Sequence, residues 1–130
     1  MAVARLPATQ AAVVRALAIA QLFAEDAGLP DAARDTLAIV VEEWTINIVE
    51  HGQAAPDSLI ALRIERTGDM VRLTVSDAGQ PFDPREAVST GPNLERGGGV
   101  GLDLIRAWTR IESYRRRAGR NRLVLGIPLG

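Results

Sequence analysis

Hydrophobic residues recur at helical spacing in the first part of the chain. Residues 9–28 are dominated by Ala, Val, Leu and Ile, and Gly28 is a typical stop signal. A second helix is predicted from Pro30-Asp31 to His51, because proline favours the first turn and Gly52 follows the last residue. The apolar stripe of this helix consists of Leu37, Val41, Trp44 and Ile48. The pattern predicts two consecutive helices, the second with one buried face.

Alternating apolar and polar residues predict strands further along. Residues 58–66 and 70–76 alternate in this way, and Thr67-Gly68-Asp69 between them is typical of a hairpin turn. Two more strands are predicted at about 111–117 and 121–129. One face of the last strand carries Leu123, Leu125, Ile127 and Leu129. Ala118-Gly119-Arg120-Asn121 joins the two.

A loop and a third helix separate the two strand pairs. The segment from Asp77 to about Val100 is rich in Gly and Pro, and a loop of this length in a small domain is usually functional. The third helix is expected from about Gly101 to Arg110. This order predicts a single α+β domain over residues 1–130, a two-layer sandwich with about three helices on one face of a mainly antiparallel sheet.

Composition narrows the function. The chain has 130 residues, 47% hydrophobic and 24% charged, as expected for one globular domain. All 15 basic residues are Arg, which excludes a P-loop lysine and Lys-based chemistry. The absence of Cys excludes disulfides and Cys-ligated metal sites, and the single His argues against a His-built metal site and a Ser-His-Asp triad. No apolar run is long enough to span a membrane, and the start does not resemble a signal peptide, so we expect a cytoplasmic protein.

Charge is distributed unevenly. Residues 1–57 hold eight acidic residues and three Arg, whereas residues 96–130 hold eight Arg and two acidic residues. Five of these arginines belong to the last predicted hairpin: Arg115, Arg116, Arg117, Arg120 and Arg122. Such a cluster is either a solvated face or a surface for an acidic protein partner. The overall net charge of −1 argues against nucleic acid and gives no indication of a membrane surface.

Polar residues form a second stripe on the second helix. Glu43, Asn47 and His51 are spaced by four, so they lie on one side, at the border of the apolar stripe. One interpretation is a Mg²⁺ and base site, with an amide oxygen for the cation and a carboxylate for an attacking hydroxyl. The other is an Asn that is hydrogen-bonded in a helix–sheet seam, with Glu43 at the surface. For His51, an interaction with the helix dipole is a sufficient explanation.

Two loops contain glycines in suggestive places. Asp77 follows a strand and precedes Gly79, so its carboxylate could accept from an exocyclic amine beside an approachable backbone, or the pair could form an ordinary turn. Gly97-Gly98-Gly99-Val100-Gly101 runs directly into a helix that begins with Leu102. Glycines before a helix N-terminus favour phosphate binding over a flexible linker.

Together these segments resemble a known superfamily. Glu43-x3-Asn47-x3-His51, Asp77-x-Gly79-x-Pro81-Phe82 and the segment Gly97 to Leu102 resemble the N, G1 and G2 boxes of GHKL ATPases. The resemblance covers about residues 9–129 and implies the Bergerat, or histidine-kinase-like ATPase, fold. Among GHKL proteins the short chain looks like the anti-sigma factor serine/threonine kinases of bacterial partner switching.

The resemblance implies a role for each motif residue. Glu43 would be the general base and Asn47 the ligand of Mg²⁺. The ATP-binding set would be Asn47, His51, Asp77, Gly79, Phe82, Gly97, Gly98, Gly99, Val100, Gly101 and Leu102. Residues of about 85–100 would form the ATP lid. Because no lysine is present there, we expect Arg85 or Arg96 to help neutralise the phosphates.

The implied function is phosphorylation of an anti-sigma factor antagonist of the STAS type, with a sigma factor as another partner. A non-catalytic switch that uses ATP to order its partner surface is the alternative. A histidine kinase fragment is a further one, although the single His lies within the nucleotide helix. Family members usually begin with a strand that helps them dimerise and that is longer than Met1 to Ala8 would allow. The pattern therefore leaves homodimerisation open.

Overall fold

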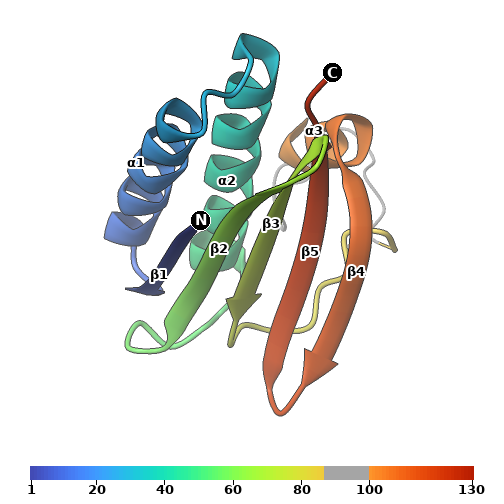
Figure 1. The fold of residues 1–130 in the computed structure, drawn as a ribbon. Helices are drawn as coiled ribbons and strands as arrows, with labels where there is room; N and C mark the ends of the chain where they lie inside the picture. Colours follow the sequence, from blue (N-terminus) through green and yellow to red (C-terminus); the bar gives the residue numbers. More distant parts are fainter. Residues whose placement is uncertain (87–99) are drawn as a thin grey trace.

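A computed structural model describes residues 1–86 and 100–130. Within these residues the chain forms a five-stranded antiparallel sheet and three helices (Figure 1). The elements are β1 (Ala2–Pro7), α1 (Gln10–Asp26), α2 (Asp31–His51), β2 (Leu59–Thr67), β3 (Met70–Asp77), α3 (Val100–Trp108), β4 (Arg110–Arg117) and β5 (Arg120–Pro128). The strand order is β1-β2-β3-β5-β4. The predicted α+β sandwich is thus confirmed.

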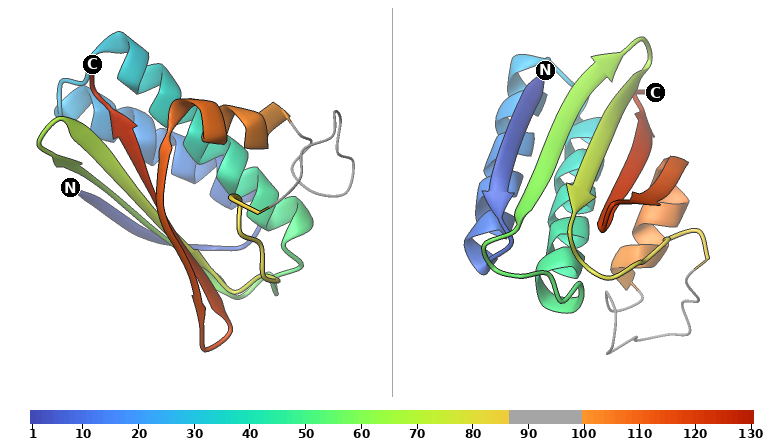
Figure 2. Two further views of the ribbon diagram at one scale, coloured as in Figure 1. Left: turned by 90° about the vertical axis from the view of Figure 1, so that its right-hand side faces the viewer. Right: turned by 90° about the horizontal axis from the view of Figure 1, so that it is seen from below.

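The helices lie together on one face of the sheet, and the other face is open (Figure 2). The predicted apolar stripe of α2 is buried: Leu37, Val41, Trp44 and Ile48 are each at most 3% exposed. It shares one core cluster with alternate residues of the central strands, namely Ile64, Leu73, Val75, Leu123 and Leu125. This two-layer core is the main support of the fold, because apolar area removed from water is its principal stabilising term.

Strand β1 was not predicted. Residues Ala2–Pro7 pair antiparallel with β2, from Ala2 opposite Ile64 to Pro7 opposite Leu59. The inward positions are Ala2, Ala4 and Leu6, of which only Leu6 is fully buried. Two alanines give a weak apolar alternation, so the strand depends on its pairing with β2 more than on its own sequence.

The order of the last two strands follows their composition. β5 lies between β3 and β4 and contains a continuous buried run from Leu123 to Ile127. β4, which holds three consecutive arginines, is an edge strand. The β4–β5 hairpin extends past the rest of the sheet (Figure 1), and its turn residues Ala118 and Gly119 both have positive φ, 52° and 76°.

Candidate functional site

A buried carboxylate marks the end of β3. Asp77 is 4% exposed, and its Oδ1 accepts hydrogen bonds from the backbone N–H of Gly79 (2.8 Å) and from Asn121 Nδ2 (3.1 Å). Among the described residues, no donor reaches the other oxygen, Oδ2. Two donors therefore fix the carboxylate, and one oxygen is left to accept from a ligand such as an exocyclic amine.

Asn121 is a site residue that the sequence analysis missed. It lies opposite Asp77 in the β3–β5 register and is buried. Besides Asp77, its Nδ2 donates to the backbone oxygens of Gly79 (3.3 Å) and Gln80 (3.0 Å). The sequence placed Asn121 in a connecting turn. The feature of the sequence that could have identified Asn121 is a single amide side chain close to the apolar run of β5.

Two β4 side chains complete this network. The Tyr114 hydroxyl donates to Asn121 Oδ1 and accepts from the backbone N–H of Phe82 (3.1 Å). Arg116 Nη1 donates to the same Asn121 oxygen (3.0 Å) and to the backbone oxygen of Gly79 (2.8 Å). Side chains of β4 and β5 thus fix the loop after Asp77 at Gly79 and at Phe82. The loop is therefore preorganised for binding.

Gly79 sits where a side chain has no room. A Cβ at this position would lie 2.8 Å from both Asp77 Oδ1 and the backbone oxygen of Gly52, which follows α2. The next residue, Gln80, donates its backbone N–H to Gly52 O (2.8 Å) and its amide Nε2 to His51 O (2.9 Å). The loop therefore packs directly on the end of α2. His51, whose side chain is half-buried, makes this contact through its backbone.

Asn47 and Glu43 lie one turn apart on α2. Asn47 is 3% exposed, and neither its Oδ1 nor its Nδ2 has a hydrogen-bond partner among the described residues. A buried amide without partners costs about 1–3 kcal/mol. Its retention fits a group that is satisfied by a ligand, and a neutral oxygen of this kind suits Mg²⁺. The alternative interpretation, in which Asn47 is hydrogen-bonded in a seam between helix and sheet, does not hold among the described residues.

Glu43 is a half-buried carboxylate with a raised pKa. Burial is the main cause of the increase, and the negative charge of Glu42 adds to it. A carboxylate with a raised pKa is a stronger proton acceptor than an exposed one. A Cβ at Gly101 would collide with Glu43 Oε2 and lie 3.0 Å from its Cδ. The carboxylate therefore faces the first turn of α3, where the helix dipole favours negative charge.

An aromatic pair closes one side of the same region. The rings of Trp44 and Phe82 are stacked, with centroids 5.9 Å apart and an interplanar angle of 27°. They belong to a small hollow lined by Glu43, Trp44, Asn47, Phe82, Gly101, Leu102 and Ile105. The hollow itself is small, about 10 Å³, against roughly 300–1,000 Å³ for small-molecule sites, so it marks where these groups converge and is not a preformed nucleotide cleft.

The structure thus brings together most of the expected residues. Glu43, Asn47, Phe82, Gly101 and Leu102 share one hollow. The loop that carries Phe82 connects it to Asp77 and Gly79, which lie at the end of β3. Val100 begins α3, whereas Gly97, Gly98 and Gly99 lie outside the described residues.

The structure describes one of the two arginines that we expected to help neutralise the phosphates. Arg85 pairs with Asp83, with Nη2 2.7 Å from Oδ2, and this bond lowers the pKa of the Asp83 carboxyl. The guanidinium of Arg85 is thereby engaged by a carboxylate. Arg96 lies outside the described residues, so its role stays a prediction.

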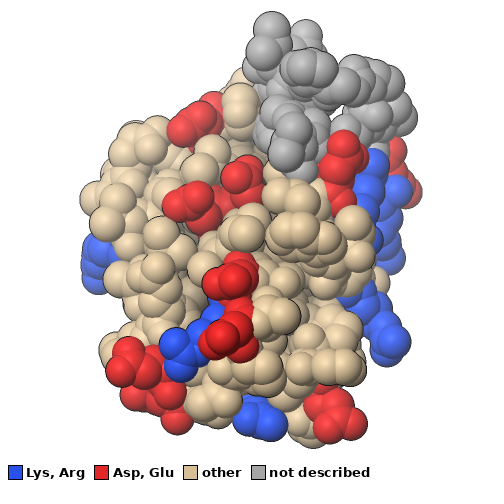
Figure 3. Space-filling model, turned by 90° about the horizontal axis from the view of Figure 1, so that it is seen from above, with Lys and Arg blue, Asp and Glu red and all other residues tan. Residues whose placement is uncertain are grey.

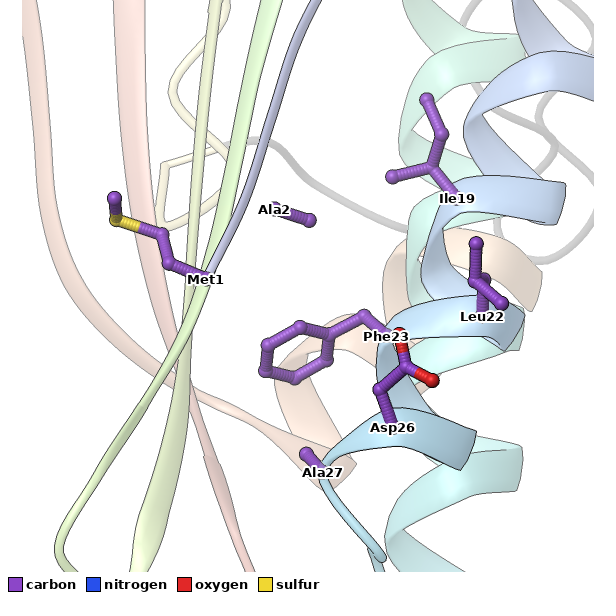
Figure 4. A pocket seen from close by; sticks show the side chains of 7 residues that line it. All are labelled: Met1, Ala2, Ile19, Leu22, Phe23, Asp26 and Ala27. Carbon is purple, nitrogen blue, oxygen red and sulfur yellow. The ribbon is translucent and has the colours of Figure 1, made fainter.

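A separate hollow lies between the start of β1 and α1 (Figure 4). It is lined by Met1, Ala2, Ile19, Leu22, Phe23, Asp26 and Ala27. Asp26 is its one ionisable side chain. None of the helices in the described parts of the chain is both long and apolar enough to cross a bilayer.

The chain is similar in sequence and in overall fold to known proteins. The chain is 36% identical over 99 residues to the serine/threonine-protein kinase BtrW of Bordetella bronchiseptica, covering 71% of this chain and 68% of that protein. A structure of the RsbU and RsbW domains of a Mycobacterium tuberculosis protein superposes with a TM-score of 0.64 at 20% identity. This similarity covers 99% of the chain, which spans 33% of that larger protein.

The fold is shared more widely. The catalytic domain of the histidine kinase ThkA gives a TM-score of 0.58 at 17% identity, covering 99% of this chain and 97% of that domain. The model of the histidine kinase-like ATPase domain family matches residues 6–127. The matched segment includes α2, the loop after β3 and α3, the three elements that form the hollow. The chain therefore belongs to the histidine kinase-like ATPase domain family.

Proposed function

We propose that the chain is an ATP-dependent protein serine/threonine kinase of the anti-sigma factor type. The observation that carries the proposal is the pairing on α2 of a base with a raised pKa, Glu43, and a buried amide without partners, Asn47. ATP binding is implied by family membership, and the similarity to BtrW supports transfer to a hydroxyl acceptor.

The roles of the residues follow from their surroundings. Asp77 would accept the adenine amino group on the oxygen that no described donor occupies, and Gly79 would let the ring approach. Trp44 and Phe82 would supply apolar contact. Gly97 to Gly101 and the first turn of α3 would surround the phosphates with backbone N–H groups.

Two residues of α2 would act at the phosphate end. Asn47 would hold Mg²⁺, which when bound offsets phosphate charge. Glu43 would take the proton of the acceptor hydroxyl. The hydroxyl oxygen would then bond to the γ-phosphorus while the bond between that phosphorus and ADP breaks. We place the acceptor Ser or Thr on a STAS-type antagonist, with a sigma factor as another partner, in the cytoplasm. Whether two copies assemble is left to measurement.

The test is phosphate transfer from labelled MgATP to a panel of STAS-type antagonists. We expect the wild type to label an acceptor Ser or Thr. Glu43→Gln should still be stabilised by MgATP but should transfer about 10²–10⁴ times more slowly, the usual contribution of a general base. Undiminished transfer by Glu43→Gln contradicts the base assignment. Nucleotide binding by the wild type without transfer to any antagonist favours the non-catalytic switch.

A further inference from the structure

The open face of the sheet carries a row of side chains that the nucleotide site does not use. In the strand register, Arg5, Ala61, Ser76, Arg122 and Arg115 lie side by side across all five strands. Since side chains alternate along each strand, these five residues share the face away from the helices. Arginines therefore stand at both sides of a floor of small residues.

The surface is hollowed along this row. One shallow hollow includes Arg5, Ala61, Ser76 and Arg122 in its lining. A second is lined by Ser76, Arg115, Arg117, Arg120 and Arg122. Because Ser76 and Arg122 belong to both, the two hollows join into one trough. We call it the arginine trough and define it by Arg5, Ser76, Arg115, Arg117 and Arg122.

The cations of the trough lack counter-charges. Arg63, which also lines the first hollow, is paired with Glu65 (3.2 Å), and Arg72, elsewhere on the same face, is paired with Glu112 (3.0 Å). For Arg5, Arg115, Arg117 and Arg122, no carboxylate lies within salt-bridge distance in the described part of the chain. No acidic side chain lines either hollow.

Carboxylates instead gather at the opposite end of the molecule. The end that carries the α1–α2 connection shows acidic side chains both across its middle and at its rim, with fewer basic side chains between them (Figure 3). Exposed acidic residues of the elements that meet there are Glu25, Asp26, Asp31, Asp35 and Asp69. The guanidinium groups of the trough, unpaired within the described residues, give it a local positive charge, which attracts anionic partners over about a Debye length.

We propose that the arginine trough is the docking site for an acidic segment of a partner protein. Guanidinium groups bind carboxylates through paired N–H donors, and four of them in one trough suit several Asp or Glu side chains in a row. No aromatic side chain lines either hollow, so the stacking platform that single-stranded nucleic acid prefers is missing from these linings. The chemistry favours a polypeptide.

The trough is separate from the nucleotide hollow. Arg116, which lies between Arg115 and Arg117 on β4, reaches the other side of the sheet and bonds to Gly79 and Asn121. Binding of an acidic segment by Arg115 and Arg117 is therefore expected to leave that network undisturbed. An acidic segment and nucleotide are expected to bind at the same time, and the docking site does not depend on the proposed kinase activity.

The test is binding of a fluorescein-labelled deca-glutamate peptide to the full chain, followed by anisotropy at low salt. The trough variant is Arg115→Glu/Arg122→Glu. The matched control, Arg15→Glu/Arg110→Glu, makes the same charge change at two exposed arginines outside the trough. We expect the trough variant to bind about tenfold more weakly or worse, and the control to stay near the wild type. Saturating MgATP should leave the wild-type affinity unchanged.

Other results overturn the proposal. Absence of peptide binding by the wild type, or equal weakening in both variants, reduces the trough to a solvated face. Equal binding of a ten-residue oligothymidylate with the same dependence on Arg115 and Arg122 assigns the trough to nucleic acid. Self-association in sedimentation that the trough variant abolishes assigns it to a second copy. Circular dichroism and the thermal midpoint confirm that both variants are folded.

Discussion

Replacement of Asn121 by Ala should damage both the fold and the nucleotide site. The Asn121 amide makes three donor bonds, to Asp77 Oδ1, Gly79 O and Gln80 O, and accepts two more at its Oδ1. In Asn121→Ala, Asp77 Oδ1 keeps only the donor from Gly79. Of the two backbone oxygens of the loop, Gly79 O keeps the donor from Arg116 (2.8 Å), whereas Gln80 O loses the donor that Asn121 supplied.

The size of the effect follows from these bonds. Buried polar groups left without partners cost about 1–3 kcal/mol in the free energy of unfolding. For a chain of 130 residues, 1 kcal/mol changes the thermal midpoint by about 4 °C, so we expect a decrease of roughly 4–12 °C. The affinity for MgATP should fall about tenfold if the looser Asp77 costs roughly 1.4 kcal/mol of binding.

Thermal unfolding with and without MgATP measures both quantities. Arg122→Ala is the matched control, because Arg122 is the next residue, is exposed and lies on the other face of β5. A surface change of this kind should stay within about 0.5 kcal/mol of the wild type. If Asn121→Ala has the same midpoint and the same MgATP shift as Arg122→Ala, the Asn121 network does not support the loop.

Three further substitutions test single contacts. Asn47→Leu should raise the thermal midpoint of the nucleotide-free protein, because it removes a buried amide without partners worth about 1–3 kcal/mol, and should abolish Mg²⁺-dependent ATP binding; a lower midpoint contradicts this. Gly79→Ala should destabilise by about 1–3 kcal/mol in urea unfolding, because the new Cβ meets two oxygens at 2.8 Å, and an unchanged midpoint excludes the clash. Burial raises the pKa of Glu43, so its ionisation in the fold costs stability as pH rises above the pKa of the unfolded chain. Glu43→Gln should therefore be more stable than the wild type at pH 7, with the difference lost below about pH 4, and a difference independent of pH argues against the raised pKa.

Local patterns were sufficient for much of the fold. The spacing of Leu37, Val41, Trp44 and Ile48 identified the buried face of α2, and the same periodicity placed Asn47 at its edge. Glycine positions were also informative, since Gly28 has the positive φ (62°) expected of a helix stop. These features are encoded over one or two helical turns, where the sequence and the structure share the same period.

Features that depend on pairing between distant segments were harder to predict. β1 has one large inward residue, Leu6, beside two alanines, and is defined by the strand it pairs with. Asn121 gains its role from Asp77, which is 44 residues away and becomes its neighbour only because β5 lies next to β3. No local period indicates such a register, although the apolar run of β5 already marks it as a central strand. The arginine trough likewise exists only once five strands are side by side.

The central claim is that the loop after β3 binds the base of ATP through Asp77. The most direct measurement is titration calorimetry of MgATP with the wild type and with Asp77→Asn. The account predicts saturable binding by the wild type and a stabilisation of about 2.7 kcal/mol at a hundredfold excess over the dissociation constant. In Asp77→Asn the amide oxygen can still accept from Gly79 and Asn121, but an NH2 donor replaces the second oxygen that would accept from the adenine amino group, so binding and stabilisation should both be lost. Binding of equal strength by the two proteins, or no binding by the wild type at millimolar MgATP, would contradict the claim.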